Sequence, residues 1–162
     1  MHLFLHELVH LLISLAIGFL VWRKYKEPLP AFVAALLGGI YIDADHLFDY
    51  YLAFGFNFNL SYFLNSYQFS VSRKIYVPFH AWEWVILLLV LIVILERRYY
   101  RHRAKVLKYL LSFFLALTLG IYSHLIIDTV TNDTTLPGYS IIYRVINNFN
   151  TDKISNEKLP ID

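Results

Sequence analysis

Histidine and acidic side chains recur near the ends of the most apolar segments of this chain. Ionisable groups inside apolar segments are costly in a bilayer, so their clustering indicates a functional site. Imidazole and carboxylate groups are the ligands that zinc and similar divalent ions accept. We therefore predict a membrane-embedded metal site with a hydrolytic role. Its candidate metal ligands are His10, Asp43, Asp45, His46, His80, Glu83, His124 and Asp128, with His6 and Asp49 as further candidates.

The densest of these motifs follows two glycines, Gly38 and Gly39, which allow helices to approach closely. Asp43, Asp45 and His46 come within four residues, and Asp49 follows one helical turn after Asp45. On a continuous helix Asp45, His46 and Asp49 would share one side, with Asp43 just beyond His46. An ordinary polar helix end at the membrane interface is the alternative reading.

Two further pairs have helical spacing. His80 and Glu83 are three residues apart, and His124 and Asp128 are four apart, so each pair is predicted to share a helix face. A hydrogen-bonded tie between helices would also explain either pair taken alone. A carboxylate outside the coordination sphere could serve as general base. Asp45 and Glu83 are the predicted catalytic residues, and Asp49 is a third candidate for the base.

An alternative chemistry comes from the first apolar segment, where His2, His6 and His10 step by four. His6, Glu7 and His10 fit the HExxH pattern, in which two histidines bind zinc and the glutamate acts as base. This pattern predicts an intramembrane metalloprotease. Side chains that reach to interfacial water are the simpler reading of His2 and His6. A non-catalytic metal-binding membrane protein is a third possibility.

Composition favours lipid as the solvent of this chain. Its 162 residues are 58% apolar and 18% aromatic, and the mean hydropathy is +0.51. Soluble domains are only about 45–50% apolar. The net charge of +2 is too small to indicate nucleic-acid binding. The absence of cysteine excludes disulfides, thiolate metal sites and cysteine nucleophiles.

The apolar segments predict one all-α domain over residues 1–162, a membrane-embedded four-helix bundle. The spans are expected at about 2–22, 31–51, 79–95 and 106–130, since about 20 residues cross a bilayer. A polar, aromatic loop over 54–78 and a short helix within 139–149 are expected at the interface.

Charge predicts the orientation. The connections after the first and third spans, together with Lys108 at the start of the fourth, carry nine of the fourteen lysines and arginines, so both connections are expected in the cytoplasm. Both termini and the metal site would then lie on the extracytoplasmic side of the cell membrane. Arg73, Lys74 and Arg144 would lie on that side too, either neutralising an anionic substrate or serving only as surface residues.

Four blocks resemble the YdjM-type family of small membrane-bound metal-dependent hydrolases. The blocks are His10–Ser14, Asp43–His46, His80 and Gly120–Asp128, and the resemblance extends to about Gly138. The family's His-Arg-Gly-x-x-His-Ser element is reduced here to its last histidine, His80. Glu83 follows three residues later, which suggests that it replaces a ligand.

The resemblance implies a chemistry, because the family is similar in turn to zinc-dependent phospholipase C and to single-strand nucleases. It implies cleavage of a phosphoester by a cluster of two or three divalent ions, most simply zinc. The expected partners are membrane lipid and a small-molecule or lipid phosphoester.

Overall fold

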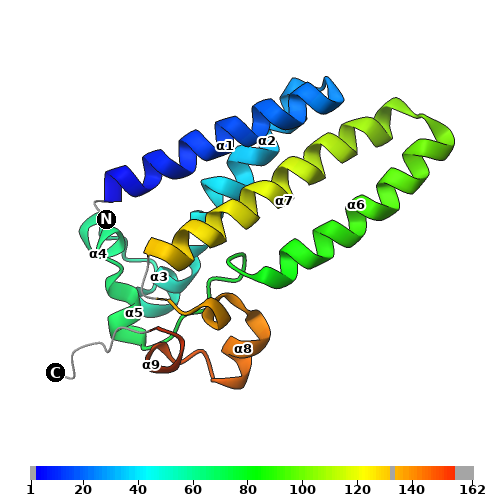
Figure 1. The fold of residues 1–162 in the computed structure, drawn as a ribbon. Coiled ribbons are helices and arrows are strands. Elements are labelled where there is room, and N and C mark those ends of the chain that lie inside the picture. Colours follow the sequence, from blue (N-terminus) through cyan, green and yellow to red (C-terminus); the bar gives the residue numbers. More distant parts are fainter. Residues whose placement is uncertain (1–2, 132–133, 156–162) are drawn as a thin grey trace. The chain divides into compact units, whose positions relative to one another are not determined.

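The computed structural model describes residues 3–131 and 134–155, so His2 lies outside the described residues. Within these ranges the regular secondary structure is helical, apart from two isolated β-bridges, as the sequence predicts. Figure 1 shows the helices along the chain. Two compact units emerge: a helical unit, Met1–Ile42 with Trp82–Ile127, and a loop unit, Asp43–Ala81 with Asp128–Asp162.

Long helices make up the helical unit. They are α1 (Leu3–Tyr25), α2 (Pro28–Gly39), α6 (Trp82–His102) and α7 (Lys105–Thr131), whose last turn belongs to the loop unit. Pro28 and Pro30 stand in the first turn of α2, where a missing N–H costs no helical hydrogen bond. Short helices and connecting segments make up the loop unit. Its helices are α3 (His46–Phe54), α4 (Leu60–Leu64), α5 (Tyr67–Ser72), η2 (Leu136–Tyr139), α8 (Ile141–Ile146) and α9 (Thr151–Ile154).

Two helices are long and apolar enough to cross a membrane: Phe4–Tyr25 and Lys105–Thr131. They correspond to the first and fourth predicted spans. The second predicted span is interrupted at Ile40, where α2 ends and the 3₁₀ helix η1 (Tyr41–Asp45) begins. Pro28–Gly39 and Tyr41–Phe54 would make a third span only if the two segments count as one. The chain therefore has two to three candidate spans.

The third predicted span, residues 79–95, is not among these candidates. The helix α6 begins at Trp82, and Glu83 and Glu96 bound its uncharged stretch. At 1.5 Å per residue that stretch covers about 18 Å, short of the roughly 30 Å of hydrocarbon. The predicted four-helix membrane bundle is thus not confirmed.

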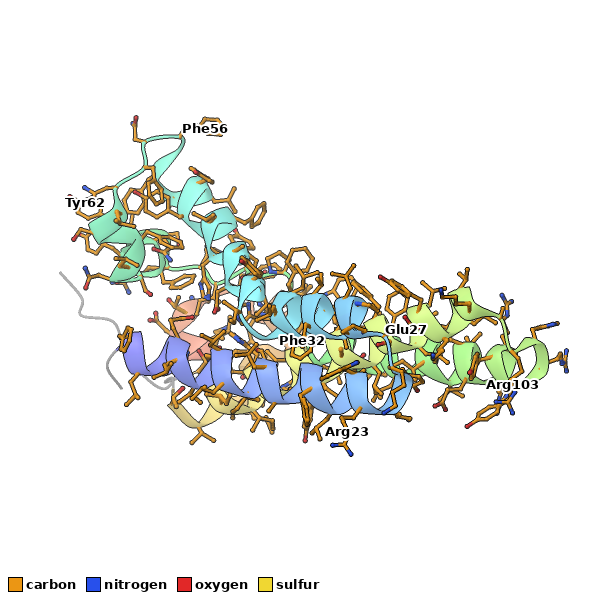
Figure 2. All side chains as sticks on the ribbon, turned by 90° about the horizontal axis from the view of Figure 1, so that it is seen from above. Arg23, Glu27, Phe32, Phe56, Tyr62 and Arg103 are labelled. Carbon is orange, nitrogen blue, oxygen red and sulfur yellow. The ribbon has the colours of Figure 1, made fainter. Side chains whose placement is uncertain are left out.

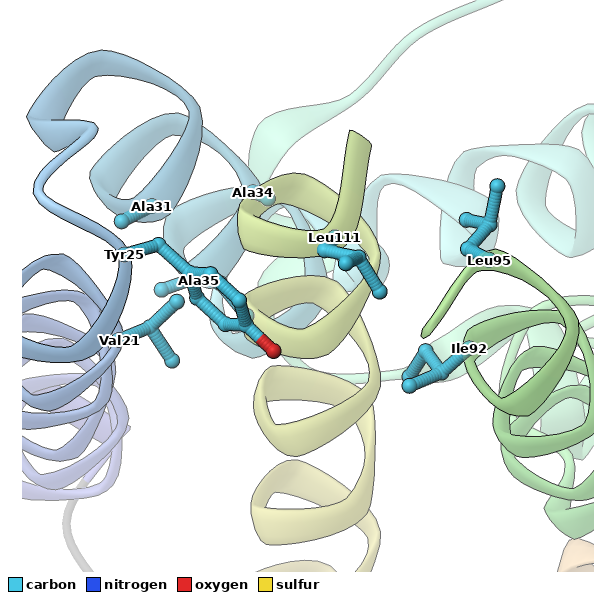
Figure 3. Packing of buried hydrophobic residues seen from close by; sticks show 9 residues of the cluster. Val21, Tyr25, Ala31, Ala34, Ala35, Ile92, Leu95 and Leu111 are labelled. Atoms are coloured by element: carbon cyan, nitrogen blue, oxygen red, sulfur yellow. The ribbon is translucent and has the colours of Figure 1, made fainter. Parts of the chain in front are cut away.

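An apolar core holds the helical unit together (Figure 3). Val21 and Tyr25 of α1 belong to it with small residues of α2, with Ile92 and Leu95 of α6, and with Leu111 of α7. Many apolar side chains on the same helices remain exposed, among them Leu20, at 64%, and Ile86, at 61%. Exposed apolar side chains over long helices suit lipid contact better than water.

Glycines bring α2 and α7 into close contact. A Cβ atom added at Gly38 would lie 2.5 Å from the carbonyl oxygen of Leu117, and one at Gly120 would lie 2.9 Å from that of Ala35. A side chain at either position would therefore collide with the backbone of the facing helix. This contact realises the close approach that the two glycines before the Asp43–His46 motif predict.

Ion pairs join the two basic connections at one end of the helical unit. Lys108 Nζ lies 3.1 Å from Glu27 Oε1, and Lys24 Nζ lies 3.9 Å from Glu96 Oε1. Figure 2 shows Arg23 near the end of α1 and Arg103 at the turn between α6 and α7. The two connections thus occupy the same end of the helical unit.

An aromatic cluster organises the first part of the loop unit. Tyr50 is fully buried, and its ring contacts those of Phe54, Phe58 and Phe63 at centroid distances of 5.0–5.9 Å. Its hydroxyl accepts a hydrogen bond from Asn59 N–H at 2.8 Å. Phe56, at the tip of the connecting loop, is 95% exposed (Figure 2).

Candidate metal centre

Three predicted ligands of the loop unit form a group that could hold a metal ion: Asp43, His46 and His80. Asp43 Oδ1 lies 3.1 Å from His80 Nε2 and 3.6 Å from His46 Nε2. Asp43 belongs to η1 and His46 begins α3. A 3₁₀ turn aligns side chains three residues apart, so the interruption of the predicted helix brings these two together.

His80 is held by acidic side chains at both ring nitrogens. Its Nδ1 lies 2.9 Å from Asp45 Oδ1, while its Nε2 faces Asp43. Asp128 Oδ2, from the last turn of α7, lies 3.9 Å from the same Nε2. His80 and Asp45 are almost completely buried. A carboxylate at one ring nitrogen and a ligand cluster at the other is the arrangement that orients metal-binding histidines.

The backbone before His80 is fixed by two buried carboxylates. The N–H groups of Tyr76 and Val77 donate to the two oxygens of Asp49 at 2.7 and 2.8 Å, and that of Phe79 donates to Asp45 Oδ2 at 2.8 Å. Buried backbone donors need acceptors, and charged acceptors make the stronger bonds. The two aspartates thus position the segment that carries His80.

A buried arginine holds the carbonyl groups of the same segment. The guanidinium of Arg144, in α8, donates from Nη1 to the carbonyl oxygens of Tyr76 and Val77, and from Nη2 to that of His80. Arg144 is completely buried. The expected surface role is therefore wrong for this residue. Its sequence context, a short apolar stretch over 141–146, gave a weak sign of burial and none of its partners.

The other two basic candidates bind within the loop unit. Lys74 Nζ donates to the carbonyl oxygen of Asn148 at 2.6 Å, and Arg73 Nη1 lies 3.8 Å from Asp152 Oδ2. Both contacts join the segment before His80 to the C-terminal segment. They favour a surface structural role for these residues.

The distances within this group fit a metal ion. Ligands around a tetrahedral ion with bonds of about 2.0–2.1 Å are about 3.3 Å apart. The separations of 3.1 and 3.6 Å from Asp43 Oδ1 fall on either side of that value, and Asp128 lies somewhat farther away. Imidazole and carboxylate ligands without thiolates suit zinc and also manganese. The donor set therefore fits a divalent ion without selecting one.

The helical unit brings three of its histidines into contact with one another. His6 Nε2 and His10 Nε2 share a hydrogen bond of 3.0 Å, and the rings of His10 and His124 stack at 4.1 Å. His124 Nδ1 lies 3.1 Å from the carbonyl oxygen of Gly39. Only a protonated nitrogen can donate to a carbonyl, so the neutral ring presents Nε2 as a lone-pair donor. His124 is thus oriented as a metal ligand would be.

The predicted pairing of His80 with Glu83 on one helix face is wrong. His80 precedes α6, which starts at Trp82, because the backbone of its segment is bonded to side chains instead of to a helical turn. Glu83 is half-buried in the first turn of α6 and belongs to the helical unit. His124 and Asp128 do share a face of α7, one turn apart.

No protein-family model, curated protein or solved structure matches this chain.

Proposed function

We propose that this chain is a membrane-bound hydrolase that depends on a divalent metal, most simply zinc, and cleaves a phosphoester. The observation that carries the proposal is the convergence of Asp43 Oδ1, His46 Nε2 and His80 Nε2 at ligand-to-ligand distances. A tie between helices needs only one such pair. Three donors around one point, backed by a buried orienting carboxylate, are typical of metal centres.

Each residue of the centre has a task in this proposal. Asp43, His46 and His80 would hold the ion, and Asp128 would complete the set. Asp45 would keep the His80 ring oriented, because its two oxygens face His80 Nδ1 and the Phe79 N–H. These contacts favour a positioning role for Asp45 over the role of general base. When bound, a divalent ion supplies an activated water molecule and stabilises the charge that develops on a phosphoryl group.

The exposed fraction of the ligands leaves access for a substrate. The side chains of Asp43 and His46 are 30% and 29% exposed, whereas those of His80 and Asp45 are buried. A centre with one buried and one open side can admit a substrate while keeping its ligands fixed. In a protein with candidate spans, a lipid phosphoester is the substrate class closest at hand, and we place the centre on the extracytoplasmic side by the charge of the connections.

The experiment is a hydrolysis assay on detergent-purified protein with two substrates, a chromogenic phosphodiester and phospholipid vesicles. We expect hydrolysis that a chelator removes, that added zinc or manganese restores, and that His80→Ala abolishes. His102→Ala, an exposed histidine of α6, serves as control. Hydrolysis that survives chelation and His80→Ala alike would overturn the proposal.

One variant distinguishes the HExxH metalloprotease from the proposed phosphoester hydrolase. Glu7→Gln should leave phosphoester hydrolysis within a factor of about two of wild type if the loop unit holds the active centre. A metalloprotease would lose its activity entirely, because the glutamate is its general base. Cleavage of a membrane peptide that Glu7→Gln abolishes would favour the protease. Metal binding without turnover of any tested ester or peptide would favour a non-catalytic protein.

A further inference from the structure

The segment Tyr76–His80 is held in a conformation that it would not adopt alone. Val77 has φ +28°, in the left-handed region, which is unfavourable for a β-branched residue. Such a conformation persists only where the surrounding structure imposes it. The position of His80 therefore depends on whatever fixes this backbone.

Charged side chains bind the backbone of this segment at both its N–H groups and its carbonyl groups. Asp45 and Asp49 accept from the N–H groups, and Arg144 donates to the carbonyl oxygens of Tyr76, Val77 and His80. A planar guanidinium carries five donors in a fixed fork, so it can bind several carbonyls at once. Lysine carries its charge on a single nitrogen, so it could not reproduce the forked contact with these carbonyl groups.

The C-terminal segment presents Arg144 through contacts of its own. Ser140 Oγ caps α8 by accepting from Tyr143 N–H, and Phe149 N–H donates to the Arg144 carbonyl at 2.7 Å. Ile75 N–H donates to the Phe149 carbonyl at 2.9 Å, and the rings of Tyr76 and Phe149 lie 4.7 Å apart. The arginine is thus supported by the same segment that flanks the backbone it holds.

We infer that Arg144 is a positioning residue of the metal centre: through the carbonyls of Tyr76, Val77 and His80 it sets where the His80 imidazole stands. The inference rests on the proposed metal centre. It makes residues 134–155 part of the functional site, although they contribute no ligand. Residues that orient metal ligands typically change metal affinity by about 10–100-fold when removed.

Three variants test the inference. Arg144→Gln removes the charge and most donors, Arg144→Lys keeps the charge without the fork, and Arg144→Ala opens space for added guanidinium. Arg73→Gln is the matched control, because it removes a charge and breaks an ion pair, with Asp152, that joins the same two segments. Zinc affinity by chelator competition and the visible spectrum of bound cobalt are measured, together with amide exchange over residues 76–81 in the metal-free protein.

We expect Arg144→Gln to weaken zinc binding by about 10–100-fold, to alter the cobalt spectrum and to speed exchange over residues 76–81. Arg144→Lys should bind less tightly than wild type, and millimolar guanidinium should tighten binding by Arg144→Ala alone. Arg73→Gln should match wild type in all three measurements. If Arg144→Gln does not fold, Arg144→Lys and the guanidinium response of Arg144→Ala decide the matter.

The outcomes separate this inference from the proposed function. Metal binding by wild type with equal affinity and an unchanged cobalt spectrum in the Arg144 variants would overturn the positioning role and leave the metal centre intact. A wild type that binds no zinc or cobalt would overturn both.

Discussion

The two units of this protein satisfy their buried polar groups in different ways. In the helical unit, buried hydroxyls bond to helix carbonyls or caps: Ser14 Oγ donates to His10 and Thr118 Oγ1 to Phe114 in their own helices, and Ser112 Oγ donates to Glu27 at the start of α2. In the loop unit, buried charged side chains bond to irregular backbone, as Asp49 and Arg144 do. A helix satisfies its own backbone hydrogen bonds, so helices that pack together need only complementary surfaces. Irregular segments need charged partners, and here those partners also position His80.

The largest effect on zinc affinity should come from removing His80, the ligand that the irregular backbone of the loop unit positions. His80→Ala should weaken zinc binding by more than about 100-fold, since loss of a ligand exceeds loss of its orienting partner. Chelator competition measures the affinity, and far-ultraviolet circular dichroism checks that the helices persist. His102→Ala should bind zinc as wild type does, and equal affinities in the two variants would break the account.

Removing a carboxylate that holds the irregular backbone should cost the next largest amount. Asp49→Ala leaves the Tyr76 and Val77 N–H groups without their acceptor, at about 1–3 kcal/mol for each buried donor. We expect the free energy of unfolding to fall by about 2–6 kcal/mol in denaturant titration. Asp152→Ala, at an exposed carboxylate, is the control. A loss no greater than that control would contradict the assigned role of Asp49.

In the helical unit, stability should depend more on the glycines between packed helices than on charged side chains. Gly38→Val forces a branched side chain against the backbone of α7, and such overpacking costs about 1–3 kcal/mol. Thermal unfolding of the detergent-purified protein measures the loss. Leu37→Val, at a neighbouring exposed position, should change the unfolding temperature far less. Equal shifts would show that α2 and α7 are not in close contact.

The smallest effect is expected at the surface pair of the loop unit. Arg73 and Asp152 are 42% and 44% exposed at a distance of 3.8 Å, and exposed pairs contribute about 0–1 kcal/mol. Asp152→Asn should therefore lower stability by less than about 1 kcal/mol, and 0.5 M salt should remove the difference. A larger loss that persists in salt would mean that the pair has a role beyond the surface.

The sequence predicted the two long apolar helices well, because hydropathy over twenty residues is a strong local signal. It also predicted that Asp43, His46 and His80 come together, since residue types limit which groups bind metal. The prediction from sequence failed where the backbone is hydrogen-bonded to side chains that are distant in the chain. The position of His80 before α6 and the burial of Arg144 depend on contacts between segments far apart in the chain, and the break at Ile40 was not predicted either. Local periodicity carries no trace of those contacts.

The metal content per chain of detergent-purified protein, measured under metal-replete conditions beside Asp43→Ala, tests the central claim most directly. Asp43 Oδ1 faces the Nε2 atoms of both histidines of the group, at 3.1 and 3.6 Å. The account predicts at least one tightly bound divalent ion per wild-type chain and its loss in Asp43→Ala with the helices preserved. A folded wild type without bound metal, or equal metal in the two proteins, would contradict it.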